Sequence, residues 1–153
     1  VKMDSIWKLE SDIDDCSGEV LGYTMECLLD AGAREVHYLP VQMKKNRPAY
    51  ELCVLCLEEE IPIMEQIIFS NTTTIGIRRC RMERTVLTRE IQIVETFYGA
   101  ARVKICTVLD GENSESVKRC YPEYESIFDL SRKSGKSYQQ IYQMIVEEWN
   151  KAI

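Results

Sequence analysis

The stretch Gln42-Met43-Lys44-Lys45-Asn46-Arg47-Pro48 joins two apolar segments that each have the pattern of a β-strand. A tight strand connection requires only turn formers such as Asn or Gly, so this concentration of positive charge exceeds what the turn needs. The side chains of Lys44, Lys45 and Arg47 offer only N–H donors, which suits a phosphate or carboxylate ligand. The alternative is a solvated turn whose charges protect a sheet edge.

The two flanking segments indicate where this turn lies in a sheet. Residues 34–43 form the first segment, and Pro40 within it removes one backbone donor, which favours an edge strand. Residues 50–57 are apolar on both faces, which favours the sheet centre.

The remaining elements of the first half complete a known order. The pattern predicts a strand over 5–12, a helix capped by Ser17 and ended by Gly32, a helix over 61–71, and a strand beginning at Ile75 and Ile77. The order β-α-β-β-α-β is the split βαβ, or ferredoxin-like, arrangement, whose second strand lies at an edge and whose third lies in the centre. We therefore predict an α+β fold with a ferredoxin-like subdomain over residues 1–84.

The pattern changes beyond residue 84. Alternating apolar residues on both sides of Tyr98-Gly99 predict a hairpin over 91–105, and residues 110–116 read as a polar loop. Two helices follow, one ended by Gly135 and one begun by a capping box at Ser137. We predict a second, small α+β subdomain over residues 85–153, made of a β-hairpin and two helices.

Composition excludes several classes of protein. The net charge of −6 argues against a general nucleic-acid binder, and no apolar run approaches the roughly 20 residues of a membrane span. The seven scattered cysteines form no disulfide-like spacing and point to the cytoplasm. Because the chain begins at Val1, we expect it to be part of a longer protein.

Cysteine and histidine do not predict a metal site of their own. Cys53 and Cys56 lie in the apolar run, where residues three apart point to opposite faces of a strand and cannot share a ligand. We interpret both as small core residues. His37 is the only histidine, so a His-rich metal site is excluded.

The acidic corner Asp12-Ile13-Asp14-Asp15 is a candidate metal site. Asp12 and Asp14 project to one face of an extended segment, and neighbouring carboxylates repel unless a cation or proton separates them. A hard divalent ion is a natural partner, with Asp15 as a weaker candidate. The alternative is that these charges complement the N-terminus of the next helix.

A second basic region follows the helix over 61–71. Hydroxyl groups of Thr72, Thr73 and Thr74 precede Gly76 and a row of arginines, namely Arg78, Arg79, Arg81 and Arg84. Such a set can hold a polyphosphate by charge-assisted hydrogen bonds. The alternative is a helix cap followed by a strand with solvated charges.

The three clusters together describe a nucleoside triphosphate with Mg²⁺ or Mn²⁺. Cations would hold the phosphates, and the acidic corner would hold the metal that bridges them. The sequence contains neither GxxxxGK[ST] nor GxGxxG, so a nucleotide site here is of another kind.

Four stretches resemble the C-terminal domain of the LarC family, in the same order along the chain. They are residues 10–15 (Glu-Ser-Asp-Ile-Asp-Asp), 43–48 (Met-Lys-Lys-Asn-Arg-Pro), 72–78 (Thr-Thr-Thr-Ile-Gly-Ile-Arg) and 121–125 (Tyr-Pro-Glu-Tyr-Glu). The resemblance implies an enzyme that inserts nickel into pyridinium-3,5-bisthiocarboxylic acid mononucleotide. It also implies a CTP-dependent cyclometallation in which CTP is cleaved to CMP and pyrophosphate.

The resemblance implies roles for the residues already singled out. CTP would be held by Lys44, Lys45, Asn46, Arg47, Thr72, Thr73, Thr74, Arg78, Arg79 and Lys104, and Mn²⁺ or Mg²⁺ by Asp12 and Asp14. Weaker candidates are Asp15, Arg84 and Glu123. The implied partners are the pincer-nucleotide precursor, an N-terminal domain that handles Ni²⁺, and further copies of the chain.

Two other functions fit the same residues. A ferredoxin-like regulatory module would bind a nucleotide or another anion without reacting with it. A structural assembly domain would carry the cationic clusters as surface charge only. Cleavage of CTP separates the first from an enzyme, and ligand binding that survives neutralisation of Lys44 and Lys45 would favour the second.

Overall fold

The computed structural model describes residues 2–109 and 116–153, which form two compact units. The first unit contains residues 3–85, and the second contains residues 86–153 together with Lys2. Each unit is described by itself.

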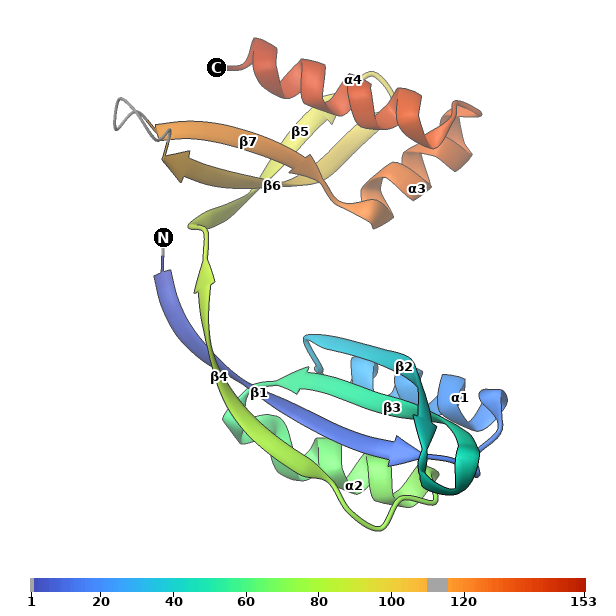
Figure 1. Ribbon diagram of the computed structural model, residues 1–153. Helices are drawn as coiled ribbons and strands as arrows, with labels where there is room; N and C mark the ends of the chain where they lie inside the picture. Colours follow the sequence, from blue (N-terminus) through green and yellow to red (C-terminus); the bar gives the residue numbers. More distant parts are fainter. Residues whose placement is uncertain (1, 110–115) are drawn as a thin grey trace. The chain divides into compact units, whose positions relative to one another are not determined.

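The first unit has the predicted ferredoxin-like order. Its elements are β1 (Lys2–Ile13), α1 (Gly18–Asp30), β2 (Glu35–Met43), β3 (Arg47–Cys56), α2 (Ile61–Asn71) and β4 (Arg78–Val86). The sheet order is β2-β3-β1-β4, and β3 pairs antiparallel with both neighbours (Figure 1). Pro40 therefore lies on an edge strand, as predicted.

One boundary differs from the sequence prediction. The fourth strand begins at Arg78 rather than at Ile75, because residues 72–77 use their polar groups elsewhere. The Gly76 carbonyl accepts hydrogen bonds from the hydroxyls of Ser11 (2.8 Å) and Thr74 (3.0 Å). Ile75, which has 99% of its surface exposed, contributes nothing to the core.

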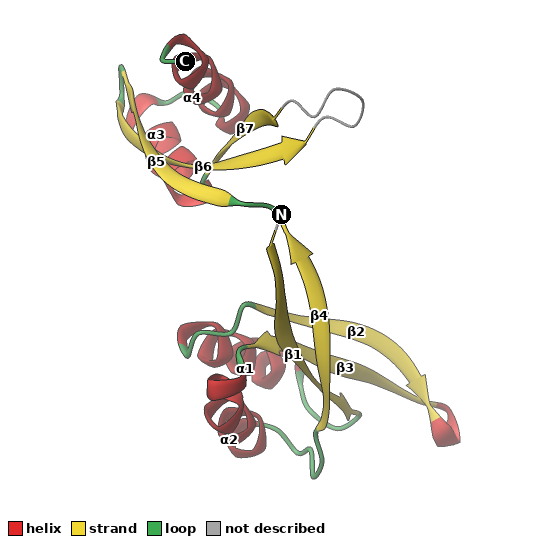
Figure 2. Ribbon diagram, turned by 90° about the vertical axis from the view of Figure 1, so that its left-hand side faces the viewer, coloured by secondary structure: helices red, strands yellow, loops and turns green. Residues whose placement is uncertain are grey.

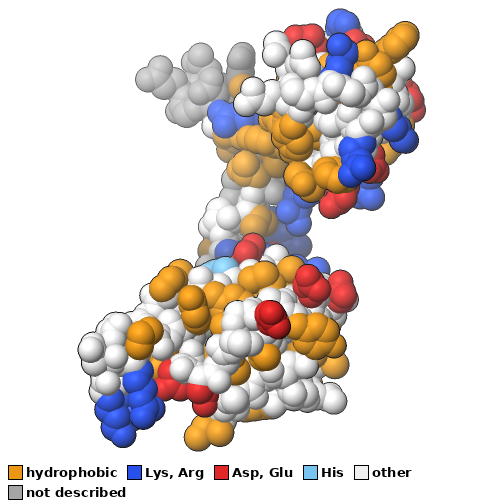
Figure 3. All heavy atoms as spheres, turned by 90° about the vertical axis from the view of Figure 1, so that its right-hand side faces the viewer, with side chains coloured by type: hydrophobic (Ala, Val, Ile, Leu, Met, Phe, Trp, Pro, Cys, Tyr) orange, Lys and Arg blue, Asp and Glu red, His pale blue; other side chains and the backbone are white. Residues whose placement is uncertain are grey.

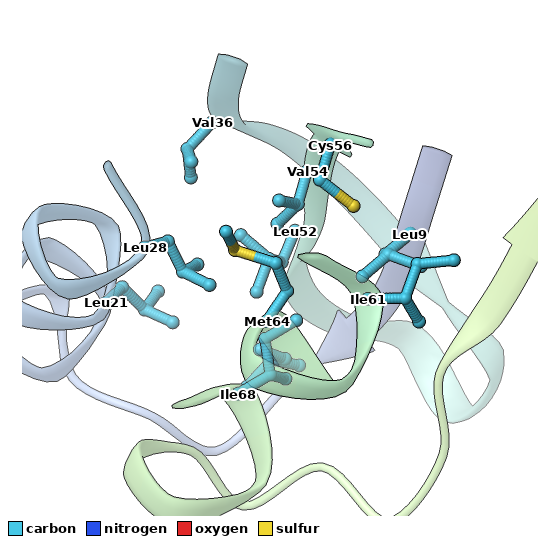
Figure 4. Close-up of a cluster of buried hydrophobic side chains, with 11 residues drawn as sticks. Leu9, Leu21, Leu28, Val36, Leu52, Val54, Cys56, Ile61, Met64 and Ile68 are labelled. Carbon is cyan, nitrogen blue, oxygen red and sulfur yellow. The ribbon is translucent and has the colours of Figure 1, made fainter. Parts of the chain in front are cut away.

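Both helices of the first unit cover one face of its sheet, and the core lies between them and the strands (Figure 2). Met64 points from α2 into this core, among side chains that include Leu28 of α1 and Leu52 of β3 (Figure 4). Cys56 belongs to this core, whereas Cys53, also buried, lies beside Glu10 on the other face. The prediction that the two sulfurs cannot share a ligand is confirmed.

The second unit contains a strand that the sequence did not predict. Its elements are β5 (Arg89–Thr96), β6 (Gly99–Leu109), β7 (Ser116–Pro122), α3 (Tyr124–Ser134) and α4 (Tyr138–Lys151). The predicted hairpin is β5–β6, but β7 extends it to a three-stranded sheet of order β5-β6-β7. The loop predicted over residues 110–116 falls outside the described residues except for Ser116, which begins β7.

The missing signal for β7 has a physical reason. Within β7 only Cys120 is buried, so the strand lacks the apolar alternation that marks a core-facing segment. The helices were easier to predict. The left-handed conformation of Gly135 (φ 71°) ends α3, and the Ser137–Gln140 capping box begins α4.

Among the described residues, no helix is long and apolar enough to cross a membrane.

The packing of the first unit leads to a stability prediction. Met64 has no exposed surface, so Met64→Ala leaves a cavity and should lower the free energy of unfolding by about 2–5 kcal/mol. Ile63, its neighbour on α2, is 43% exposed, and Ile63→Ala should cost less than about 1 kcal/mol. Urea unfolding measures both. Equal losses would contradict this description of the core.

Candidate functional site

The basic turn ends the β2–β3 hairpin, which projects at one end of the sheet (Figures 1 and 2). Lys and Arg side chains gather at this tip, beside acidic side chains (Figure 3). Lys45 and Asn46 both have left-handed backbone conformations, with φ of 62° and 57°. Asn tolerates this conformation, but Lys pays roughly 1–2 kcal/mol for it. A strained lysine at an exposed tip suggests a use for its charge.

The basic hairpin meets the acidic corner through one ion pair. Arg47, at the base of the turn, donates from Nη1 to Asp14 Oδ2 at 3.2 Å. The lysines at the tip are exposed, and neither Lys44 nor Lys45 has an ion-pair partner within residues 2–109 and 116–153. They are therefore available to an anion.

The threonine segment also lies against this corner. The Thr73 hydroxyl donates to Asp15 Oδ1 and lies 3.3 Å from the Cys16 sulfur. The Thr74 hydroxyl pairs with Ser11 of β1, which is only 2% exposed. Through this hydrogen bond, Ser11 holds the threonine segment beside the corner, although the two lie more than sixty residues apart in the sequence. Residues 12–15, 47 and 72–74 come together at one end of the unit.

Arg78 joins the same region from β4. Its guanidinium donates to Asp12 Oδ2 at 3.0 Å and to Glu10 Oε1 at 3.1 Å, and it lies 3.6 Å from Glu51 Oε2. Asp12 and then Glu10 raise the pKa of Arg78, so its positive charge is secure. Hydrogen bonds from Lys8 and Arg78 lower the pKa of Glu10. Arg78 is the cation that this unit places beside Asp12.

A second group of possible metal ligands lies next to Arg78. One donor atom each from Glu10, Glu51 and Cys53 falls within 4.8 Å of the others. Burial raises the pKa of Cys53 to about 11, so its thiol is protonated at neutral pH and donates to Glu51 at 3.3 Å. Because Lys8 and Arg78 already neutralise Glu10, we interpret this group as an ion-pair network of the sheet.

Two predicted arginines lie away from the corner. Arg79 points to the helix-covered face and pairs with Glu65 of α2 at 2.9 Å, because successive residues of a strand face opposite sides. Arg84 lies farther along β4 and pairs with Asp4 of β1 at 2.6 Å. Neither side chain contacts the corner residues Asp12, Asp14 and Asp15.

The two remaining candidates belong to the second unit. Lys104 of β6 lies 3.5 Å from Glu123, and the same carboxylate lies 3.3 Å from Arg102. These residues form a group of charges within the second unit.

The corner offers oxygen donors of the kind that Mg²⁺ and Mn²⁺ prefer. In this structure, however, Asp12 and Asp14 each hold an arginine. Both pairs are partly exposed, and such pairs contribute only about 0–1 kcal/mol. An incoming phosphate can therefore take the arginines while the carboxylates turn to a divalent ion, so the donor set fits.

Ser11, Glu10 and Glu51 were not predicted from sequence. Ser11 shares the phase of Leu9 and Ile13, so a hydroxyl in the buried series of a strand was the available signal. Glu51 lies directly opposite Asp12, and only the register of β1 with β3 reveals this pairing.

Comparison with known proteins supports one family. The profile of a family described as "Nickel insertion protein" matches residues 1–142. The chain is 50% identical over 136 residues to the pyridinium-3,5-bisthiocarboxylic acid mononucleotide nickel insertion protein of Alkaliphilus metalliredigens, covering 89% of this chain and 31% of that protein. It is 36% identical over 140 residues to the protein of the same description from Lactiplantibacillus plantarum, covering 92% and 32%.

Solved structures agree with this result. The chain matches the apo form of the C-terminal domain of a cyclometallase involved in synthesis of the NPN cofactor of lactate racemase, with a TM-score of 0.84, 34% identity, and 97% and 99% of the two chains covered. A protein from Methanopyrus kandleri, at 22% identity and a TM-score of 0.67 over 95% and 88% of the chains, shares the fold. The chain spans about a third of the length of the curated relatives it matches.

The conformation of Lys45 leads to a test that separates stability from ligand binding. Lys45→Gly removes the left-handed strain, so the free energy of unfolding should stay unchanged or rise by up to about 1 kcal/mol. The same change should weaken the binding of inorganic triphosphate, because one of the free cations is lost.

Lys45→Asn is the matched variant, since it tolerates the same conformation and also lacks the charge. Thermal unfolding and triphosphate titration measure the two effects. If either variant lost stability and kept its affinity for triphosphate, the lysine would have a structural role instead.

Proposed function

Because the chain belongs to the nickel insertion protein family, we propose that its first unit binds CTP with Mn²⁺ or Mg²⁺ during nickel insertion into pyridinium-3,5-bisthiocarboxylic acid mononucleotide. One observation carries the proposal. Unpaired lysines, two arginine–carboxylate pairs and a threonine segment converge at one end of the unit.

The basic residues would bind the triphosphate. Lys44 and Lys45 would receive phosphate at the tip of the hairpin, and Arg47 and Arg78 would exchange their carboxylate partners for phosphate oxygens. A guanidinium binds phosphate in a bidentate manner, so each arginine would make two hydrogen bonds to phosphate after the exchange. Asn46 would complete this set of phosphate-binding residues through its side-chain amide.

Asp12 and Asp14 would hold the divalent ion, which would neutralise charge on the phosphates. Each carboxylate needs a new positive partner once its arginine turns to phosphate. The hydroxyls of Thr72, Thr73 and Thr74 would then donate to phosphate or ribose. Without the ligand the Thr73 hydroxyl donates to Asp15, so its turn toward the ligand would free Asp15 as a weaker candidate for the ion.

The whole reaction would need more than this chain. We propose that CTP is cleaved to CMP and pyrophosphate, that Ni²⁺ is a substrate, and that an N-terminal domain of the same protein supplies the nickel ligands. The curated relatives are about three times as long as the matched region, which supports a role for further residues. Association of several copies, for example through the exposed edge strand β2, is part of the same proposal.

The regulatory module remains a second candidate. The first unit has the ferredoxin-like fold, and a module of this kind would bind the nucleotide and leave it intact. Detection of CMP and pyrophosphate after incubation with CTP, Mn²⁺, Ni²⁺ and the mononucleotide separates the two, because only the enzyme produces them.

The phosphate site leads to a binding prediction. In calorimetric titration with CTP and Mn²⁺, Arg47→Gln and the double change Lys44→Gln with Lys45→Gln should each weaken binding by 10-fold or more, in line with roughly 1.5–3 kcal/mol for a charged hydrogen bond. Arg84→Gln is the control, since Arg84 pairs with Asp4 and does not contact the corner. A wild-type chain that bound none of the four nucleotides CTP, UTP, ATP and GTP would contradict the proposal.

The metal site leads to a different prediction. Asp14→Asn should abolish the dependence of CTP binding on Mn²⁺, while metal-free binding should hold steady or improve because Arg47 no longer has a competing carboxylate. Glu83→Gln, an exposed change on β4, should leave the metal dependence unchanged. Titrations with Mn²⁺ and with EDTA provide the comparison. Persistent Mn²⁺ dependence in Asp14→Asn would rule out this ligand.

A further inference from the structure

The sheet of the second unit has one face that its helices leave open. Val94, Val103 and Cys120 point toward α3 and α4, so the alternate residues of each strand point away from them. The register places Lys104 between Ile91 on β5 and Tyr121 on β7. These three residues form a row across the open face.

This face is basic although the chain as a whole is acidic, with a net charge of −6. Four cations lie on it, namely Arg89, Arg102, Lys104 and Arg119, and each is exposed. Arg89 and Arg119 have no ion-pair partner within residues 2–109 and 116–153. Glu95, Glu123 and Glu125 of the neighbouring positions carry the opposite charge, so the cations are in excess on this face. An anion is the natural occupant of such a face.

An aromatic ring lies in the middle of these charges. Tyr121 is 41% exposed, and with Lys104 and Glu123 it lines a depression of about 400 Å³. Known small-molecule sites span roughly 300–1,000 Å³, so the depression can hold one ring with its substituents. Glu123 lies at its edge, held by Lys104 and Arg102.

We propose that this face of the second unit binds the pyridinium mononucleotide substrate, whereas the first unit binds CTP. This inference rests on the proposed function, which supplies a substrate with a cationic aromatic ring, anionic thiocarboxylates and a phosphate. A pyridinium ring stacks favourably on a tyrosine ring. The phosphate and thiocarboxylates bind Lys104, Arg102 and Arg119, and Glu123 accepts a hydrogen bond from a ribose hydroxyl.

The charge of the whole chain favours a small ligand over a nucleic acid. A polynucleotide must neutralise many phosphates over an extended surface, which an acidic protein resists. One mononucleotide needs only the few cations that surround Tyr121. The inference gives Lys104 a role in substrate binding rather than in binding CTP.

The test uses nicotinic acid mononucleotide, which carries a pyridinium ring, one carboxylate and a phosphate. Calorimetric titration of the whole chain should show binding that falls at least 10-fold in Lys104→Gln and in Arg119→Gln. Tyr121→Ala should weaken binding similarly, whereas Tyr121→Phe should keep the affinity of the wild type because the aromatic ring remains. Ribose 5-phosphate, which lacks the ring, should bind at least 10-fold more weakly.

Lys118→Gln is the matched control. Lys118 precedes Arg119 on β7, so its side chain points to the other side of the sheet. There it lies 3.6 Å from Glu90. The affinity of the Lys118→Gln variant for nicotinic acid mononucleotide should stay within twofold of that of the wild type. All variants should keep CTP binding, so failure of the CTP site and failure of this site give different results.

Any of the following results would overturn the inference. The wild-type chain does not bind the pyridinium mononucleotide, or Lys118→Gln loses as much affinity as Lys104→Gln, or ribose 5-phosphate binds as tightly as the probe. Tighter binding of oligouridylate than of the mononucleotide would also overturn it and would indicate a nucleic-acid surface instead.

Discussion

The pairing of arginines with the carboxylates at one end of β1 determines what this corner can bind. Arg47 reaches Asp14 from the hairpin, and Arg78 reaches Asp12 from β4. Charges of both signs are thus held within hydrogen-bond distance, yet each pair remains partly exposed and individually weak. A metal–nucleotide complex, which also carries both signs of charge, can replace both pairs at once. The charges of the corner are thus balanced without a ligand, and the proposed metal–nucleotide complex would balance them as well.

The fold brings these pairs together from distant parts of the chain. Because β1 lies between β3 and β4, its open face receives side chains from both neighbours, and Arg78 contacts Glu10, Asp12 and Glu51. Ser11, on the buried side of β1, fastens the threonine segment next to Arg78. The second unit repeats the general design of a helix-covered sheet with an open face, but its open face carries cations together with Ile91 and Tyr121.

Much of this arrangement could be predicted from the sequence. Pro40 and the apolar run of residues 50–57 indicated the sheet order, and the capping residues Ser17, Gly135 and Ser137 indicated helix boundaries. The acidic corner, basic turn and threonine segment were predicted as separate clusters that together hold a nucleotide. Their contacts depend on register, so the Arg78 network could not be predicted. β7 was missed because it buries too few apolar residues to give a periodic signal.

The most direct measurement is the paramagnetic effect of Mn²⁺ on the amide NMR resonances of the chain in the presence of CTP. The account predicts strong, CTP-dependent broadening at residues 12–15, 47 and 72–74. Broadening centred on Glu10, Glu51 and Cys53, or on the second unit, would contradict it. So would Mn²⁺ broadening at the corner that is the same with and without CTP.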